Sequence, residues 1–281
     1  MKQSPQGHQA RKRFGQNFLH DQGVIRRIIR AINPKQGQHL VEIGPGLGAI
    51  TEEVLSATAE LDVVELDRDL IPILRTKFFS YGDKFRIHEA DALKFDFQSL
   101  ATDQRPLRVI GNLPYNISTP LIFHLLSYSG LIEDMYFMLQ KEVVNRLAAK
   151  PGDSAYGRLG IMAQYYCEVS SLFLVGPEAF DPKPKVDSAI VKLSPYAEPP
   201  CPADCIGDFE ALVRTAFGQR RKTLRNNLKK MLPVELIEAA GINPGLRPEN
   251  LSLEDFVLLA NHYTGYKSQQ NAVSDTSECR S

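Results

Sequence analysis

The residues best suited to chemistry stand together at positions 112–115, where the chain reads Asn-Leu-Pro-Tyr. The Asn112 amide oxygen and a backbone carbonyl near Leu113 or Pro114 can accept both hydrogens of an amine, and Tyr115 offers a stacking face. This set predicts activation of a weakly nucleophilic aromatic amine, such as that of adenine, held in line with an electrophile. By itself an Asn-x-Pro sequence is typical of a turn, so the interpretation depends on other segments.

Three glycines follow a short apolar run in the segment 41–48, which reads Val-Glu-Ile-Gly-Pro-Gly-Leu-Gly. A glycine turn between a strand and a helix lets the backbone approach a ligand closely, and we expect Gly44 and Gly46 to do so. The spacing is not the G-x-G-x-x-G of dinucleotide-binding proteins, and the sequence has no G-x-x-x-x-G-K-[ST] phosphate loop. The turn therefore favours a nucleotide-like ligand, with a tight turn that binds nothing as the alternative.

Two carboxylates end the next predicted strands. Glu65 stands where an acid can accept hydrogen bonds from both hydroxyls of a ribose. Asp91, followed by Ala92, could accept a bond from the exocyclic amine of adenine. A single acid is usually a solvated loop residue, but two acids beside a glycine turn fit an adenosyl ligand without a phosphate anchor. S-adenosylmethionine is such a ligand, and its positive charge suits this acidic part of the chain.

The elements that must position these residues are short apolar runs that alternate with helical patterns from residue 40 to about residue 194. Strands interleaved with helices predict an α/β fold with a mostly parallel sheet covered on both faces. The glycine turn, the two acids and Asn112 then all stand at strand ends. Seven strands are expected, within residues 39–43, 61–65, 85–88, 107–110, 135–139, 171–175 and 188–194.

Three prolines in the four positions 199–202 interrupt this pattern. We therefore expect a first domain over residues 1–195, with a basic N-terminal extension, and a linker over residues 196–205. A small all-helical domain is predicted for residues 206–265, with helices within 206–217, 221–231, 234–240 and 253–262. The polar tail, 266–281, is expected to be disordered.

The composition is that of an ordinary soluble protein. The 281 residues are 43% hydrophobic and include 33 basic and 33 acidic side chains, which excludes a wholly disordered or collagen-like chain. No apolar stretch is long enough to span a membrane, and residues 1–13 are polar and basic with no apolar h-region, so a cytoplasmic protein is expected. The spacing of Cys201 and Cys205 is not that of a zinc site, and no metal is expected.

The charge is segregated along the chain, although its total is zero. Residues 1–30 carry a net charge of +6 and residues 31–140 one of −6. The segment 214–230 has seven basic residues and no acidic one, with apolar residues at helical spacing. This pattern predicts a helix with one packed face and basic faces that bind RNA, with a merely solvated face as the alternative. The predicted RNA-binding residues are Arg220, Arg221, Lys222 and Arg225, with the basic segment 11–13 as a second contact.

These segments together resemble the small-subunit ribosomal RNA adenine dimethyltransferases, the kasugamycin-sensitivity enzymes. The resemblance runs from about Gly7 to Tyr263, nearly the whole predicted folded chain. Its motifs are Arg-Lys-Arg-Phe-Gly-Gln-Asn-Phe-Leu at 11–19, the glycine turn at 41–48, Glu-Leu-Asp at 65–67, Asp-Ala at 91–92, Asn-Leu-Pro-Tyr-Asn-Ile-Ser at 112–118, Phe-Asp-Pro-Lys-Pro-Lys-Val-Asp-Ser at 180–188, and Phe-Gly-Gln-Arg-Arg-Lys-Thr-Leu-Arg-Asn at 217–226.

The resemblance implies a class I, Rossmann-like methyltransferase that uses S-adenosylmethionine. The implied reaction forms N6,N6-dimethyladenosine at two adjacent adenosines near the 3′ end of small-subunit (16S) rRNA during ribosome biogenesis. The implied partner is this rRNA within a pre-assembled small subunit, and a monomer without an obligate protein partner is expected. The implied cofactor contacts are Asn17 and Leu19 in the pocket wall, Gly44 at the methionine part, Glu65 at the ribose, Asp91 at the adenine and Asn112 at both cofactor and target.

Phe180 opens a segment stiffened by Pro182 and Pro184. Its ring could face Tyr115 and sandwich a flipped adenine between the two aromatic side chains. A phenylalanine of the hydrophobic core is the alternative.

Three other functions stay open. A nicotinamide oxidoreductase would share the glycine turn and Glu65, although the glycine spacing and the Asn-Leu-Pro-Tyr segment argue against it. A ribosome-assembly factor without catalysis could keep the same fold. The erythromycin-resistance enzymes that methylate large-subunit rRNA and the DNA adenine methyltransferases share the chemistry and differ in their target.

Overall fold

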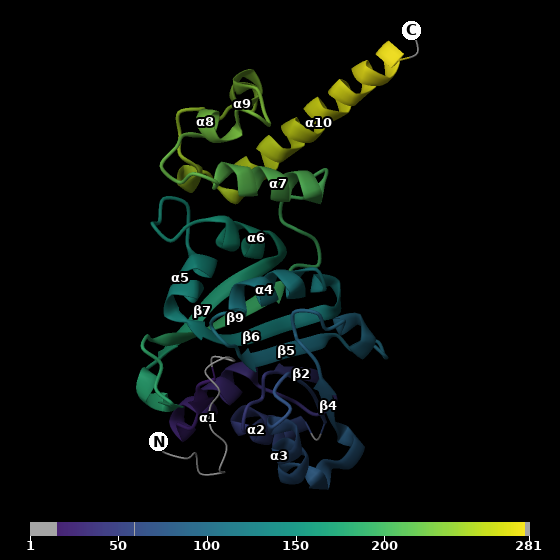
Figure 1. The fold of residues 1–281 in the computed structure, drawn as a ribbon, viewed down its shortest axis with the longest axis vertical. Helices are drawn as coiled ribbons and strands as arrows, with labels where there is room; N and C mark the ends of the chain where they lie inside the picture. Colours follow the sequence, from purple (N-terminus) through teal and green to yellow (C-terminus); the bar gives the residue numbers. More distant parts are fainter. Residues whose placement is uncertain (1–15, 59, 279–281) are drawn as a thin grey trace. The chain divides into compact units, whose positions relative to one another are not determined.

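The computed structural model describes residues 16–58 and 60–278, with only the backbone described for 271–278 (Figure 1). The chain divides into two compact units, residues 1–145 with 167–195 and residues 146–166 with 196–281. The predicted division placed 146–166 in the first domain, whereas the structure groups this segment with the second unit. The segment holds α6 (Arg158–Tyr166), which packs against helices further along the chain in the second unit.

The first unit is built on a seven-stranded sheet with the order β4-β3-β2-β5-β6-β9-β7 (Figure 1). Neighbouring strands from β4 to β6 are parallel, and β9 is antiparallel to both β6 and β7. The predicted seven-stranded, mostly parallel sheet is therefore confirmed. Its strands are β2 (His39–Ile43), β3 (Leu61–Glu65), β4 (Phe85–Glu89), β5 (Leu107–Asn112), β6 (Ile132–Gln140), β7 (Cys167–Val175) and β9 (Ser188–Pro195).

Helices cover the two faces of this sheet. Figure 1 shows α1 (Gln22–Ile32), α2 (Ala49–Thr58) and α3 (Leu70–Lys77) on one side and α4 (Ser118–Leu126) on the other. In α1 the buried residues Ile25, Ile28 and Ile32 recur at helical spacing, so one stripe of the helix joins the core of the first face. Short 3-10 helices span Phe79–Lys84, Phe97–Leu100, Ser129–Leu131 and Pro177–Ala179.

A buried ion pair ties α1 to the amino-terminal edge of the sheet. The Arg108 guanidinium donates to both Asp134 carboxylate oxygens at 2.8 and 2.9 Å. It also donates to the carbonyl of Ile32, the last residue of α1, at 2.7 Å. These bonds provide a partner for a carbonyl that the helix itself leaves unpaired. They fix the C-terminal end of α1, whose N-terminal end lies at the carboxyl edge of the sheet.

The N-terminal segment is held by a second, two-stranded sheet. Strand β1 (Phe18–Leu19) pairs antiparallel with β8 (Phe180–Asp181), which lies far along the chain. The amide of His20 extends the pairing by donating to the Ala179 carbonyl at 3.0 Å. Neither strand has a signal in the sequence, because two residues are too few to show an alternating pattern.

The second unit is helical, as predicted. Besides α6 it holds α7 (Ile206–Ala216), α8 (Leu224–Leu228), α9 (Val234–Ala239), the 3-10 helix Pro248–Asn250 and α10 (Leu253–Glu278), and α5 (Lys141–Ala148) crosses the boundary between the units. None of the helices in the described part of the chain is long and apolar enough to cross a membrane.

The prediction of a disordered tail over 266–281 is wrong for the residues that α10 includes, since this helix continues to Glu278. The sequence after Gly265 contains no proline that would end the helix. Asp208 of α7 also contacts α10 near the middle of that helix. The Lys267 ammonium lies 2.5 Å from the Asp208 carboxylate, and the Thr264 hydroxyl donates to the same group at 3.0 Å.

Gly111, the residue before Asn112, lies where two strands approach closely. A Cβ atom at this position would come within 2.6 Å of the Ile43 carbonyl oxygen in β2. Because that neighbour is backbone, we expect Gly111→Ala to lower the free energy of unfolding by about 2 kcal/mol, measured by chemical denaturation. Gly130→Ala is the matched control, since nothing lies within 4 Å of its added Cβ. Equal stability of the two variants would contradict the prediction.

Candidate active site

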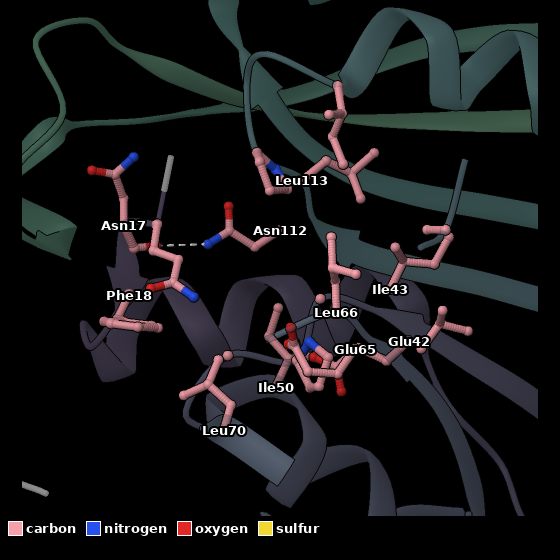
Figure 2. A pocket seen from close by; sticks show the side chains of 18 of the residues that line it. Asn17, Phe18, Glu42, Ile43, Ile50, Glu65, Leu66, Leu70, Asn112 and Leu113 are labelled. Atoms are coloured by element: carbon pink, nitrogen blue, oxygen red, sulfur yellow. Dashed lines mark hydrogen bonds between the residues drawn. The ribbon is translucent and has the colours of Figure 1, made fainter. Parts of the chain in front are cut away.

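A cavity of about 340 Å³ opens at the carboxyl ends of β2, β3 and β5 (Figure 2). The side chains predicted to bind a cofactor and a target amine come together here, because parallel strands end at the same edge of the sheet. Phe180 is the one residue of the predicted catalytic and cofactor-binding set that is not in its lining. The predicted residues that line the cavity are Asn17, Leu19, Gly44, Gly46, Glu65, Asp91, Ala92, Asn112, Leu113, Pro114 and Tyr115.

The glycine turn forms one wall of the cavity. Gly44 and Gly46 have φ angles of 65° and 59°, a region that side chains with a Cβ rarely adopt. A Cβ on Gly44 would meet only the Asn112 carbonyl oxygen, at 4.0 Å, whereas one on Gly46 would lie 3.1 Å from the Phe18 ring. The missing side chains thus leave room for a ligand between the turn and Asn112, and let Phe18 close over the turn.

The two strand-end carboxylates are fixed by backbone amides. Glu65 is buried, and its Oε1 accepts a bond from the Asp67 amide at 2.7 Å. The Asp91 Oδ1 accepts a bond from the Leu93 amide at 3.0 Å. Both carboxylates therefore stand in defined positions in the cavity wall.

Glu42 is a site residue that the sequence analysis missed. It is buried in β2, lines the cavity and accepts a bond from the Thr51 hydroxyl at 2.6 Å. Burial raises the pKa of Glu42 to about 7, and burial also raises the pKa of Glu65 to about 7. A signal was present in the sequence, because Glu42 interrupts an apolar run that must be buried on both faces.

Cofactor affinity is expected to rise about tenfold between pH 6 and pH 8, because ionised carboxylates accept stronger hydrogen bonds and attract a cation. Titration calorimetry with S-adenosylmethionine measures this rise. Glu65→Gln should flatten it and weaken binding at pH 8, whereas Glu133→Gln, which alters an exposed carboxylate of β6, should leave it unchanged. Affinity that does not vary with pH in the wild-type protein would contradict the prediction.

Stability is expected to depend on pH with the opposite sign. The folded-state pKa values of Glu42 and Glu65 lie above their ordinary value of 4.5, so the folded chain binds protons more tightly than the unfolded chain. The contribution of these two groups to stability is therefore complete below pH 4.5 and is lost as the pH rises through about 7. Chemical denaturation at pH 4, 6 and 8 without cofactor measures this loss.

Asn112 is oriented by the N-terminal segment. Its Nδ2 donates to the Asn17 carbonyl oxygen at 3.0 Å, which turns Oδ1 away from Asn17 (Figure 2). The neighbouring Gln16 donates to the Asp67 carboxylate at 2.8 Å, two residues after Glu65. The same short segment therefore contacts both the acid side of the cavity and the Asn112 side.

Tyr115 has a fixed hydroxyl. Its Oη lies 2.7 Å from the Ser188 Oγ at the start of β9, and burial raises the pKa of the Tyr115 phenol. The phenol stays neutral at physiological pH, so its ring offers a stacking face without a charge. Ser188 had no signal in the sequence that linked it to Tyr115.

Phe180 does not line the cavity. Its side chain is 1% exposed and belongs to the hydrophobic core, and its backbone pairs with Leu19 in the β1–β8 sheet. The predicted stacking of Phe180 against a flipped adenine stays a prediction, since the ring would have to leave this core position to reach a base.

The predicted RNA-binding residues lie around α8 in the second unit. The expected helix over 221–231 is shorter, Leu224–Leu228, with both of these leucines buried as predicted. Arg221, Lys222 and Arg225 are exposed, the first two in the turn before the helix. The Arg220 guanidinium instead donates to the Ser154 and Tyr156 carbonyls at 2.6 and 3.3 Å. Some of its hydrogen-bond donors are therefore used within the second unit. The basic segment 11–13 lies outside the described residues.

The sheet order with one antiparallel strand, the glycine turn and the acids at successive strand ends define a class I, Rossmann-like methyltransferase. The family described as Ribosomal RNA adenine dimethylase matches residues 7–265. The chain belongs to this family.

Curated relatives and solved structures agree with this assignment. A protein of Marinobacter nauticus named Ribosomal RNA small subunit methyltransferase A is 67% identical over 96% of this chain and 98% of its own length. A Pseudomonas aeruginosa protein of the same name is 64% identical over 90% of this chain and 94% of its own length.

Two crystal structures show the same fold. A dimethyladenosine transferase from Plasmodium falciparum has a TM-score of 0.73 and 28% identity, over 86% of this chain and 95% of its own. The 23S rRNA methyltransferase ErmE has a TM-score of 0.69 and 26% identity, over 88% of this chain and 100% of its own.

Proposed function

We propose that this chain transfers methyl groups from S-adenosylmethionine to N6 of two adjacent adenosines near the 3′ end of 16S rRNA. The product is N6,N6-dimethyladenosine, formed during biogenesis of the small subunit. One observation carries the proposal: Asn112 presents a fixed amide in the same cavity as a glycine turn and two strand-end carboxylates. Membership of the rRNA adenine dimethylase family supports it.

Different residues of the cavity wall bind different parts of the cofactor. Glu65 accepts hydrogen bonds from the ribose hydroxyls and Asp91 accepts one from the adenine amine, while the glycine turn leaves room for the methionine part. Leu19 and Ala92 supply apolar surface in the lining. When bound, S-adenosylmethionine supplies an electrophilic methyl group on a positively charged sulfur.

Asn112 and the residues after it prepare the target amine. The Asn112 Oδ1 and a carbonyl of Leu113 or Pro114 accept the two amine hydrogens, which draws the nitrogen lone pair out of conjugation with the ring and aims it at the methyl group. Tyr115 stacks on the flipped base, with its ring held by Ser188. The nitrogen becomes acidic once methylated and releases its proton to water, so these residues need not include a general base.

The small-subunit particle, rather than naked rRNA, is the proposed substrate, and the chain acts on it as a monomer in the cytoplasm. A helical unit with exposed Arg221, Lys222 and Arg225 supports an RNA contact in addition to the target adenosine. Base flipping requires an accessible but structured RNA loop, which an assembled particle provides.

A second target is considered because one of the similar structures is a 23S rRNA methyltransferase. The cavity chemistry is the same for either RNA, so the distinction depends on surfaces that recognise the surrounding RNA. Relatives above 60% identity that cover nearly the whole chain and are named for the small subunit favour the small-subunit target.

Methyl transfer from labelled S-adenosylmethionine tests the proposal. The acceptors are small subunits that lack the modification, large subunits and duplex DNA, and the products are identified by nucleoside analysis. We expect label only in small-subunit rRNA, as N6,N6-dimethyladenosine. Label in large subunits alone would favour the second target, and no label despite cofactor binding would favour a non-catalytic assembly role.

A further inference from the structure

A second cavity, of about 450 Å³, lies in the same unit where β6 ends and α5 begins. Its volume falls in the range of small-molecule sites, roughly 300–1,000 Å³. The lining includes the side chains of Gln140 and Asn145 and the apolar residues Pro177 and Val186. None of the residues assigned above to the cofactor or to the target amine lines this cavity.

Ser188 connects the second cavity to the catalytic one. Its hydroxyl bonds to Tyr115, its backbone pairs with Gln140, and the residue before it, Asp187, lines the second cavity. The Asp187 carbonyl oxygen also accepts a bond from the Lys141 amide at 3.0 Å. The second cavity and Tyr115 are therefore linked through two consecutive residues, Asp187 and Ser188.

The spacing between Asn112 and Gln140 is within reach of consecutive, unstacked nucleotides. Gln140 lies two residues beyond Met138, the register partner of Asn112, which is about 7 Å along β6, and the neighbouring strands β5 and β6 are about 4.8 Å apart. Stacked nucleotides are about 3.4 Å apart along a strand, and unstacking lengthens that step. A nucleotide in the catalytic cavity can thus place its chain neighbour at Gln140.

The lining favours a neutral, planar ligand that forms hydrogen bonds. The Gln140 and Asn145 amides make no side-chain hydrogen bond to any residue in the described part of the chain, and each offers a donor and an acceptor. Val186, which also lines the cavity, is 45% exposed, so its apolar surface is accessible to a ligand. The lysines of the lining, Lys141 and Lys185, are balanced by two carboxylates, Glu142 and Asp187, so the charge does not favour a phosphate.

We infer that this cavity is a subsite for the base of the nucleotide next to the one being methylated. The inference rests on the proposed function, in which two adjacent adenosines are modified. The amides of Gln140 and Asn145 bind the edge of the neighbouring base, and Pro177 and Val186 contact its face. While one adenosine occupies the catalytic cavity, its neighbour is held beside it, unstacked.

The test combines enzyme and RNA changes. Gln140→Ala and Asn145→Ala are assayed for methyl transfer on small subunits with the adenosine pair, and on subunits in which one adenosine is replaced by an abasic nucleotide. We expect each variant to lower kcat/KM about tenfold on the pair. On the abasic substrate the wild-type enzyme should lose a similar factor, and the variants should lose nothing further. Gln104→Ala, which alters an exposed amide before β5 at the opposite edge of the sheet, is the matched control.

The outcomes separate the subsite from the proposed function. Two results would overturn the subsite but not the proposed function. One is variants with wild-type kcat/KM on the pair, and the other is variants whose kcat/KM falls further on the abasic substrate, so that the two losses multiply. A wild-type enzyme that forms no N6,N6-dimethyladenosine on the unaltered pair would overturn the proposed function itself. Cofactor affinity is measured for each variant, and a loss there would assign the effect to distortion of the catalytic cavity and also overturn the subsite.

Discussion

Asn112→Ala is expected to lower kcat about 10³-fold at saturating cofactor while the protein stays folded. Removing the amide leaves the target amine without one of its two acceptors, a loss of the size seen when a positioned hydrogen-bonding group is removed from other active sites. The measurement is single-turnover methyl transfer to unmodified small subunits, with circular dichroism as the check on folding. Cofactor affinity should fall only a few-fold, because Glu65 and Asp91 remain in place.

Two further variants sharpen this test. Asn112→Asp keeps an acceptor oxygen but cannot donate to the Asn17 carbonyl, so its kcat should lie between those of wild type and Asn112→Ala. Gln98→Ala, at an exposed amide of the same unit, should behave as wild type. A folded Asn112→Ala variant with wild-type kcat would remove Asn112 from its assigned role.

Charge reversal at Arg221 and Lys222 is expected to weaken RNA binding about 100-fold near 0.1 M salt. Both side chains are exposed beside α8, and each phosphate contact releases about one counterion. The double variant Arg221→Glu, Lys222→Glu should therefore lower the slope of log affinity against log salt by about 2. Binding to unmodified small subunits is measured across a salt series, and cofactor affinity should not change.

The matched control for this variant reverses the same number of charges in the other unit. Arg75→Glu with Lys84→Glu alters two exposed basic residues and gives the same net charge. If both double variants bind RNA equally well and with equal salt slopes, the basic residues beside α8 are an ordinary solvated surface.

The strands of the sheet could be predicted because burial on both faces leaves a simple signature. In β2 and β3 every residue is buried, so each appears in the sequence as a short, largely apolar run between turns. The site residues at their ends followed directly, since parallel strands bring their carboxyl ends to one edge. Glu42 was missed because it stands inside β2, whereas the predicted acids stand at strand ends. Its side chain nevertheless lines the cavity.

The turn before α8 could not be predicted, because it depends on hydrogen bonds from one side chain, Asn227, that no pattern in the sequence reveals. The Asn227 amide donates to the Ala216 and Gln219 carbonyls at 2.6 and 3.1 Å. These bonds hold residues 217–223 in a turn, so the helix begins at Leu224 and not at Arg221, where it was predicted to begin. The β1–β8 pairing and the Tyr115–Ser188 contact are of the same kind, since neither partner is marked by its own neighbours in sequence.

The pairing of β1 with β8 has a consequence for synthesis on the ribosome. The N-terminal segment leaves the exit tunnel early, but its partner strand emerges only after six of the seven strands of the main sheet have been translated. Until then the segment that presents the Asn17 carbonyl to Asn112 lacks its partner strand. The nascent chain therefore completes this wall of the cofactor cavity late in translation.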